Sequence, residues 1–392
     1  MSKKKRSKAF FISGGAGRTI CSIPAFERYA KDSGDKDFII VCEGGMDFYK
    51  GHFLHKHAYD SWHKNLFEEH ILDKDIVTPE PYRINEYFTQ KCSLAQAFDI
   101  EINGLETARE VSAPSINLNK LETISGYNAI QEIKSQLNKD KAIIVQPFGR
   151  SVQQMGQYLI DSTSRSFEVG NIVAIIEELR KKYAVIIMAD LALPIPENKE
   201  HPVAMPKEPN LRLWAGMMNS ADHFLGCDSL GQHICKALDK TATVVIGSTV
   251  PINISYPEND KFDILDIGND KGRIYSPIRV TYDEMRDRIN DQVMMLNDEE
   301  TQKVIKSCES FLGGGGPFTG QFIPTHNAET CTNPEHNHNP VDIEKKMMQV
   351  PSEATEQKAR YDFDMKNLLA EGNEGKSQFV SPFGSEKPVE EK

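Results

Sequence analysis

The sequence predicts an α/β protein with two doubly wound parallel sheets that face a cleft, followed by a polar C-terminal tail. Short apolar runs rich in β-branched residues alternate with helical periodicity through both halves of the chain. Glycine or polar residues follow most of these runs directly. Open α/β sheets bind their ligands at the carboxyl ends of the strands, so these loops are where we expect a site.

Composition limits the functional class. The 392 residues suffice for two domains and a tail, and 39% hydrophobic with 26% charged residues is typical of a soluble globular protein. The net charge of −11 gives no support to nucleic-acid binding by the chain as a whole. We find no membrane-spanning run, no signal-peptide pattern and no paired cysteine spacing, and therefore expect a cytoplasmic protein with reduced cysteines.

The first half begins with a strand, a glycine-rich turn and a helix. We assign the strand to Lys8–Ser13, the turn to Gly14–Gly17 and the helix to Arg18–Lys31. In such a turn, backbone amides at Gly15 and Gly17 can approach a ligand closely, although a tight turn without a ligand is the alternative. A second strand, Asp37–Cys42, ends in another loop, Glu43–Asp47, which carries two carboxylates.

The rest of this half is less regular. Four histidines, at positions 52, 55, 57 and 63, lack the spacing of a metal site; one of them, with Asp47 or Asp60, could act as a general base. We expect an extended segment at Ile76–Arg83 and short helices at Glu86–Lys91 and Cys92–Ala97. A link at Ser112–Ser125 leads to a longer helix at Tyr127–Leu137.

The second half opens with the buried strand Lys141–Gln146. The loop after it contains Gly149, Arg150 and Ser151, and its polar run to Gln154 suits a phosphate or a sugar. Further strands are predicted at Ala184–Ala189 and Phe262–Ile267. Further helices are predicted at Asn171–Lys182, Leu211–Ser220, Thr281–Leu296 and Glu299–Leu312.

The stretch Phe224–Pro257 has the clearest organisation in the chain. A short strand is followed by Asp228 and Ser229, either of which can cap a helix from Gly231 to Leu238. The strand Thr241–Ile246 then ends in a Gly-Ser-Thr loop. A helix start attracts anions, so a phosphate site is one interpretation, and an ordinary strand–helix–strand unit is the other.

These elements divide into an N-terminal domain, residues 1–130, and a C-terminal domain, residues 131–312. Residues 313–392 form the tail, which is rich in Glu, Lys, Asn and Pro and is expected to be largely disordered. The tail contains Cys331 and histidines at positions 326, 336 and 338. These supply one thiolate and no second cysteine pair, so we prefer a disordered segment to a zinc site.

Two segments resemble the heptosyltransferase-like glycosyltransferases. GRTICSIPAF (Gly17–Phe26) is similar to the segment that starts this family's chains, and DSLGQHICKALDKTATVVIGSTVP (Asp228–Pro251) is similar to its donor-binding signature. The resemblance implies two Rossmann-like domains in the GT-B arrangement, an acceptor-side domain at residues 1–130 and a nucleotide-sugar-binding domain at residues 131–312. It also implies transfer of a sugar from a nucleotide-sugar to an acceptor hydroxyl, with inversion and without a metal or other cofactor.

The resemblance assigns roles to the second-half residues. Ser229 and nearby amides would hold the diphosphate, His233 would line the donor site, and Arg150 could neutralise the leaving group. The full implied donor-binding set is Gly149, Arg150, Ser151, Asp228, Ser229, Gly231, His233, Ser248 and Thr249.

The sequence departs from the family at two positions. Arg18 stands where the family has an acidic general base, so Asp47 and Glu43 are the first replacements to test, and Arg18 can instead bind a phosphate or an acidic acceptor. Leu230 replaces the glycine of the donor signature, with Gly231 one place later.

The acceptor is open at this level. Saccharides of lipopolysaccharide are the family default, and a hydroxylated DNA base is the alternative if the chain is phage-encoded. An inactive sugar-nucleotide-binding or structural protein with the same fold, and a sugar-nucleotide epimerase, are the rival functions.

Overall fold

The computed structural model describes residues 6–156, 158–161, 163–273 and 293–319, all within one compact unit, Met1–Thr332. The expectations for the tail beyond residue 319, including its histidines, and most of the helix predicted at Thr281–Leu296 lie outside the described residues. The six described cysteines are free and buried, which confirms that part of the prediction.

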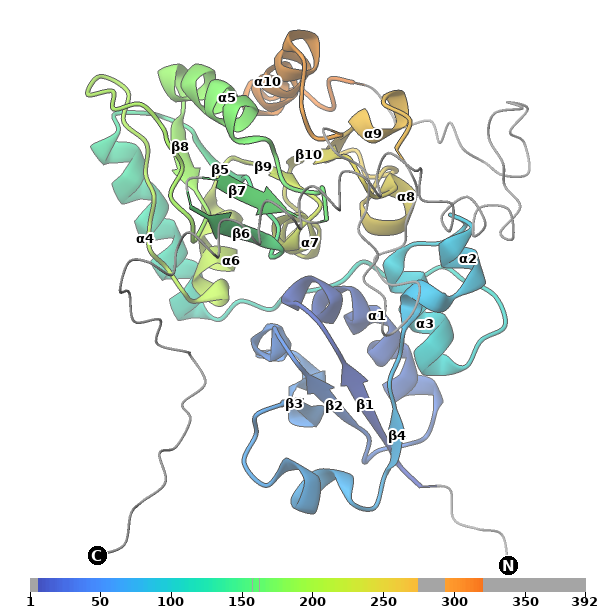
Figure 1. The fold of residues 1–392 in the computed structure, drawn as a ribbon. Helices are drawn as coiled ribbons and strands as arrows, with labels where there is room; N and C mark the ends of the chain where they lie inside the picture. Colours follow the sequence, from blue (N-terminus) through green and yellow to red (C-terminus); the bar gives the residue numbers. More distant parts are fainter. Residues whose placement is uncertain (1–5, 157, 162, 274–292, 320–392) are drawn as a thin grey trace, which may run out of the picture. The chain divides into compact units, whose positions relative to one another are not determined.

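The first sheet has four parallel strands in the order β3-β2-β1-β4 (Figure 1). The strands are β1 Lys8–Ile12, β2 Ile39–Cys42, β3 Ala58–Asp60 and β4 Asp75–Val77. Alternation along β1 places Phe10 and Ile12 in the main core, while Ala9 joins a small cluster on the other face. Strands β3 and β4 are too short to give a clear periodic signal in the sequence.

Helix α1, Ala16–Asp32, follows β1 and covers the main-core face of this sheet. Its aromatic residues pack edge-on against β1. The ring centroids of Phe26 and Phe10, for example, are 5.3 Å apart. The helices α2 and α3 span Asn85–Phe88 and Leu94–Asn103. A capping box between Ser93 and Gln96 starts α3.

Helix α4, Lys120–Gln136, begins seven residues before the predicted Tyr127, so the expected link through Ser125 is helical. The cause is a capping box: Asn119 Oδ1 accepts from Glu122 N at 2.8 Å, and Glu122 Oε2 accepts from Asn119 N at 2.8 Å. The helix crosses residue 130 and packs on α6, Leu211–Ser220, of the second half. The division at residue 130 stays a prediction.

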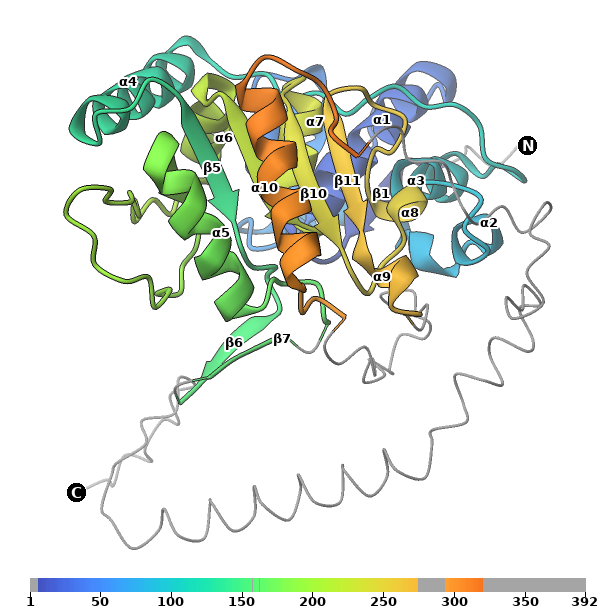
Figure 2. The ribbon, with the colours of Figure 1, turned by 90° about the horizontal axis from the view of Figure 1, so that it is seen from above.

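The second sheet has five parallel strands in the order β11-β10-β9-β5-β8. These are β5 Ala142–Gln146, β8 Ala184–Ile187, β9 His223–Cys227, β10 Ala242–Ile246 and β11 Phe262–Asp266. Helices α5 (Val169–Lys182) and α10 (Asp298–Leu312) cover one face (Figure 2). Helices α6 and α7 (Leu230–Ala237) cover the other, and the short helices α8 (Pro251–Ile254) and α9 (Ile267–Asp270) follow β10 and β11.

The sequence predicted a loop for the polar run after β5, but the structure shows regular secondary structure there. The run forms an antiparallel hairpin of β6, Val152–Met155, and β7, Tyr158–Asp161 (Figure 2). Apart from this hairpin, the two parallel sheets confirm the predicted α/β class. Among the described helices, none has the length and apolar character needed to cross a bilayer.

Candidate functional site

Strand order marks one ligand-binding edge on each sheet. In the second sheet the chain passes from β5 to β8 and returns to β9 on the other side of β5, so the order reverses between β5 and β9. In the first sheet it reverses between β1 and β4. Ligands of open α/β sheets bind at the carboxyl ends of the strands at such a reversal. Gln146 and Asp228 lie at this point in the second sheet, and Gly14 and Glu80 follow the corresponding strands of the first.

The glycine turn after β1 packs directly on the loop after β2. Gly14 N donates to the Glu43 carboxylate, and Thr19 Oγ1 donates to Gly44 O at 2.6 Å. Gly45 has a φ of 80°, and a Cβ there would lie 2.6 Å from the Cα of Ala16, so only glycine fits. The side chain of Glu43 therefore lies beside the turn, with its residue exposed.

Asp47 lies apart from this arrangement. It lies in the 3-10 turn Met46–Tyr49 and pairs with Lys50 at 2.5 Å, with about half of each side chain exposed. Of the nearby histidines, His52 Nε2 lies 2.9 Å from Glu27 Oε1 and His57 Nδ1 lies 2.8 Å from Phe38 O. These two buried histidines serve the packing of the first half.

Arg18 is buried and already has partners. Its Nη1 lies 3.3 Å from Glu80 Oε1, and its guanidinium carbon lies 4.8 Å from the ring centroid of Tyr82 and 5.5 Å from that of Phe98. The guanidinium of Arg18 is thus paired with a carboxylate from the loop after β4, which lies on the other side of β1 from β2. Sequence reasoning missed Glu80, although it follows β4 as Glu43 follows β2.

Gln146 organises the start of α7. Its Oε1 accepts from Gly231 N at 2.8 Å, and its Nε2 donates to Ser229 Oγ at 3.1 Å. Neither Asp228 nor Ser229 caps the helix with its side chain, so that expectation was wrong. A Cβ on Gly231 would meet Gln146 Oε1 at 2.5 Å and the Phe224 ring at 2.3 Å, so the position requires glycine.

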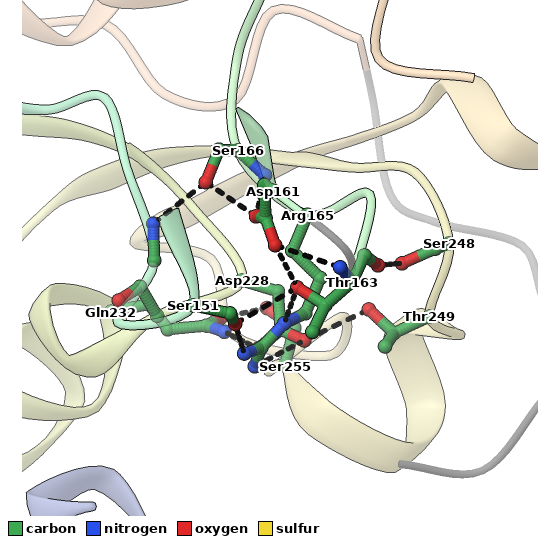
Figure 3. A network of polar contacts seen from close by, with 12 residues as sticks. Ser151, Asp161, Thr163, Arg165, Ser166, Asp228, Gln232, Ser248, Thr249 and Ser255 are labelled. Atoms are coloured by element: carbon green, nitrogen blue, oxygen red, sulfur yellow. Dashed lines mark hydrogen bonds and ion pairs between the residues drawn. The ribbon is translucent and has the colours of Figure 1, made fainter. Parts of the chain in front are cut away.

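Asp228 is enclosed by partners (Figure 3). Its carboxylate accepts from Thr249 Oγ1 at 3.0 Å and from Gln232 Nε2 at 3.2 Å, and Arg165 Nη1 lies 3.8 Å away. Ser248 Oγ donates to the carbonyl of Thr163 at 2.7 Å. Asp228, Ser248 and Thr249 are buried. The Thr249 bond joins the loops after β9 and β10, and the Ser248 bond joins the loop after β10 to the one after β7.

Asp161 at the end of β7 fixes the loop that leads to α5 (Figure 3). It accepts from the amide and hydroxyl of Thr163 at 2.8 and 2.5 Å, and from those of Ser166 at 2.9 and 2.5 Å. Ser166 Oγ in turn accepts from Gly149 N at 2.9 Å. Ser151 Oγ accepts from Arg165 Nη2 at 3.0 Å, so two of the predicted residues meet this network.

Asp161 and Arg165 were not singled out from the sequence. The run DSTSRS has the composition of local side-chain-to-backbone turns, which was the available signal.

We expect Asp161 to make stability pH-dependent. Burial raises its pKa, but the hydrogen bonds from Ser166 and Thr163 outweigh burial and hold the pKa below its usual value. Because the pKa of Asp161 is lower in the folded than in the unfolded state, its ionised carboxylate stabilises the fold at pH values above the unfolded-state pKa of about 4. This contribution is lost as the pH falls through the folded-state pKa. Urea unfolding at pH 7 should show Asp161→Asn less stable than the parent, and the gap should narrow below pH 4. A gap independent of pH would contradict this.

Two contacts join the halves at the predicted site. The exposed side chain of Arg150 lies beside Gly15. A Cβ atom built on Gly15 would be 3.6 Å from Arg150 Nη1. A Cβ on Gly17 would lie 3.0 Å from the ring of His233, whose Nδ1 is 2.8 Å from Tyr256 Oη. Burial lowers the pKa of His233 to about 4, so its imidazole is neutral at pH 7.

The arrangement can hold an anion beside Arg150 and an uncharged hydrogen-bonding group beside His233. Among residues 6–156, 158–161, 163–273 and 293–319, no three metal-ligating side chains gather.

No family model and no curated protein matches this sequence. Solved structures do match in fold. A family 9 glycosyl transferase from Veillonella parvula is 12% identical, with a TM-score of 0.56 over 80% of this chain and 99% of its own. The ADP-heptose lipopolysaccharide heptosyltransferase II of E. coli is 9% identical (TM-score 0.47, 79% and 99% covered). The iron-containing dodecameric glycosyltransferase TibC of enterotoxigenic E. coli is 12% identical (0.47, 80% and 78%).

The likeness to the Veillonella structure confirms the predicted resemblance at the level of the fold. The chain shares its two-sheet fold with this family 9 glycosyl transferase. At 12% identity this establishes the fold and leaves the reaction to be argued from the site.

Proposed function

We propose that this chain is a glycosyltransferase that moves a sugar from a nucleotide-sugar donor to an acceptor hydroxyl. The observation that carries the proposal is the exposed Arg150 beside the Gly15 turn. Both lie in loops that follow strands at the order reversals, β5 and β1, in a fold shared with a family 9 glycosyl transferase. A cation at such an edge can stabilise the negative charge that develops on a departing nucleoside diphosphate.

The proposed reaction needs one base and one cation. The acceptor hydroxyl attacks the anomeric carbon, Glu43 accepts its proton, and Arg150 with the start of α7 stabilises the leaving diphosphate. Glu43 is preferred to Asp47 because it lies beside the Gly14 turn, whereas Asp47 pairs with Lys50. His233, neutral at pH 7, offers a hydrogen bond to the donor. Direct displacement inverts the anomeric carbon and needs no metal.

The buried network is assigned a positioning role. Asp228, Ser248 and Thr249 have internal partners, so we propose that they fix the loops that shape the donor site. Gly149 and Ser151 belong to the same group, through Ser166 and Arg165. Of the predicted donor residues, Arg150 is the one we assign to direct contact with the diphosphate.

The decisive experiment is a transfer assay with the purified full chain. ADP-, GDP-, UDP- and CMP-sugars are each offered with saccharide acceptors or with hydroxymethylcytosine DNA, and nucleoside diphosphate or monophosphate release is measured with and without EDTA. We expect release that depends on one donor and survives EDTA, with product of inverted configuration by NMR. Failure of every nucleotide-sugar to shift the melting temperature would refute the proposal.

A second candidate is a sugar-nucleotide-binding protein without activity. The buried pair of Arg18 and Glu80 favours it, because this pair stands where the family resemblance places an acidic base. Binding of a donor without transfer or hydrolysis under all acceptor conditions would establish this candidate and exclude the enzyme.

Arg150→Ala should lower kcat by about 10²-fold or more, since one charge-stabilising donor is typically worth that much. Donor hydrolysis or transfer is the measurement. The matched control is Arg28→Ala: Arg28 is an exposed arginine on α1, and its removal should leave kcat within about twofold. Equal activity of the two variants would remove Arg150 from the mechanism.

A further inference from the structure

Helix α1 begins without a cap of its own. Its N-cap residue is Gly15, which has no side chain, and its first turn contains no acidic residue. Among the residues that the structure describes, no group accepts from the backbone N–H groups of Ala16 and Gly17. The helix has 17 residues, so its start carries partial positive charge as well as these open donors. A ligand group that accepts hydrogen bonds therefore fits here.

His233 turns one edge of its ring toward this helix start. A Cβ built on Gly17 would lie 3.0 Å from His233 Cδ2 and 3.6 Å from Nε2. His233 is 5% exposed, and the printed bonds of its ring are all made by Nδ1, so Nε2 has no partner in the described part of the chain. Nε2 is not one of the fully enclosed described atoms without a partner, so a ligand can reach it. A buried side chain of the second half thus directs an unpartnered nitrogen at the start of α1.

The partners of the other ring nitrogen decide where the proton lies. Nδ1 of His233 is 2.8 Å from Tyr256 Oη and 3.5 Å from Cys21 Sγ. A phenol is a strong donor and an imidazole nitrogen a strong acceptor, whereas a thiol is weak in both roles, so we assign the bond as Tyr256 Oη donating to Nδ1. Burial lowers the pKa of His233 to about 4, so the ring has one N–H at pH 7. That proton is then on Nε2.

The donors around this place favour one kind of ligand group. An uncharged hydroxyl would satisfy the Nε2–H of His233 alone. The uncapped start of α1 and the guanidinium of Arg150 beside Gly15 add further donors and positive charge, which favour an oxyanion. The start of α7 is less open, since Gln146 Oε1 already accepts from Gly231 N. A phosphoryl group has enough oxygen lone pairs to accept from all three donors of the α1 side.

We propose that the start of α1 and the Nε2–H of His233 form a phosphoryl-binding site, and that Tyr256 is a positioning residue that holds the proton on Nε2. The proposal rests on the proposed glycosyltransferase function, in which the bound group is the sugar-linked phosphate of the donor. His233 then joins Arg150 as a direct contact of the diphosphate, which spans the two halves with its other phosphate at the start of α7. A free phosphate has the same chemistry, and the test distinguishes the two sources.

The first test locates the proton of His233 in the full chain labelled with 15N-histidine. A long-range 1H–15N NMR spectrum at pH 7 distinguishes the two tautomers, and loss of signals in His233→Gln assigns them. We expect the Nε2–H form in the parent and a clear fraction of the Nδ1–H form in Tyr256→Phe, because the donor to Nδ1 is lost. Tyr183→Phe is the control: Tyr183 packs on the opposite face of the second sheet, and its change should leave the tautomer as in the parent.

The second test measures binding of inorganic pyrophosphate, ADP, GDP and UDP by calorimetry, with the melting temperature of each variant as the check on folding. His233→Phe keeps a ring but has no donor, and should weaken binding by about tenfold, the loss typical of one hydrogen bond to a charged group. His233→Gln has an amide that can donate, and should stay within about threefold of the parent. In the parent, each bound ligand should shift the Nε2–H signal.

Three results overturn the proposal. These are the Nδ1–H form in the parent, equal affinity of His233→Phe and the parent, and absence of binding by pyrophosphate and every nucleotide. If a nucleotide binds without any change at His233, this proposal alone fails and the transferase assignment stands. If pyrophosphate binds through His233 but no nucleotide does, the site is one for a free phosphate, and the transferase assignment fails.

Discussion

Gly126→Ala should destabilise the protein by about 2–3 kcal/mol, despite the higher helix propensity of alanine. A Cβ at this position of α4 would overlap the carbonyl group of Gly216 in α6 and lie 2.6 Å from Met217 N. These atoms belong to backbone and cannot turn aside, so the two helices must separate, and overpacking of this kind costs a few kcal/mol. Urea unfolding followed by the fluorescence of Trp214, buried in α6, is the measurement.

Gly170→Ala provides the matched control, a second helical glycine with different surroundings. Gly170 lies in the first turn of α5, and a Cβ there meets nothing within 4 Å. Alanine should therefore raise stability slightly, by up to about 1 kcal/mol. Similar effects at the two glycines would show that α4 and α6 do not depend on this close backbone approach.

The predictable part of the fold consists of segments whose signal is local. The strands at Ala142–Gln146 and Ala242–Ile246 are continuous β-branched or apolar runs, and helix α6 matched its predicted bounds. The β6–β7 hairpin was missed because a short strand with one solvent-facing side is rich in polar residues and resembles a loop.

The sequence predicted which candidate residues follow the buried strands, but it did not predict their internal partners. Polar loops after buried strands identified Glu43, Arg150 and Asp228 correctly as residues at carboxyl ends, because parallel sheets place those ends on one edge. The partners come from distant segments: Gln146 lies 85 residues from the helix start it bonds, and Glu80 lies 62 residues from Arg18. No local pattern encodes such pairs, since each depends on which strands become neighbours.

The same contrast separates the two groups of donor-site residues. Side chains that the family resemblance assigns to the donor, such as Ser248 and Thr249, make internal hydrogen bonds. Arg150, taken from the loop chemistry after β5, is exposed beside the opposing turn. Under the proposed function, the segment that resembles the donor signature therefore shapes the loops, and Arg150, from the loop after β5, supplies the charge that acts on the ligand.

Asp228→Ala should have the largest effect of any single change at the site, a loss of about 3–5 kcal/mol. The substitution removes the acceptor of the Thr249 and Gln232 hydrogen bonds and takes away a carboxylate 3.8 Å from the Arg165 guanidinium. Burial lowers the pKa of Arg165, but the charges of Asp228 and Asp161 outweigh burial and keep its pKa above the usual value. An arginine that loses one of these carboxylates stays charged in a poorly solvated position.

A double-mutant cycle separates this cause from the simple loss of hydrogen bonds. If uncompensated charge dominates, Arg165→Met in the Asp228→Ala background should recover part of the stability, with a coupling of at least about 1 kcal/mol in urea unfolding. Glu178→Ala, at an exposed carboxylate of α5 paired with Lys181, should cost no more than about 0.5 kcal/mol. Strict additivity of the two site substitutions would assign the loss to the Thr249 and Gln232 hydrogen bonds. Nearly full stability of Asp228→Ala would instead indicate that the carboxylate is kept for the ligand rather than for the loops.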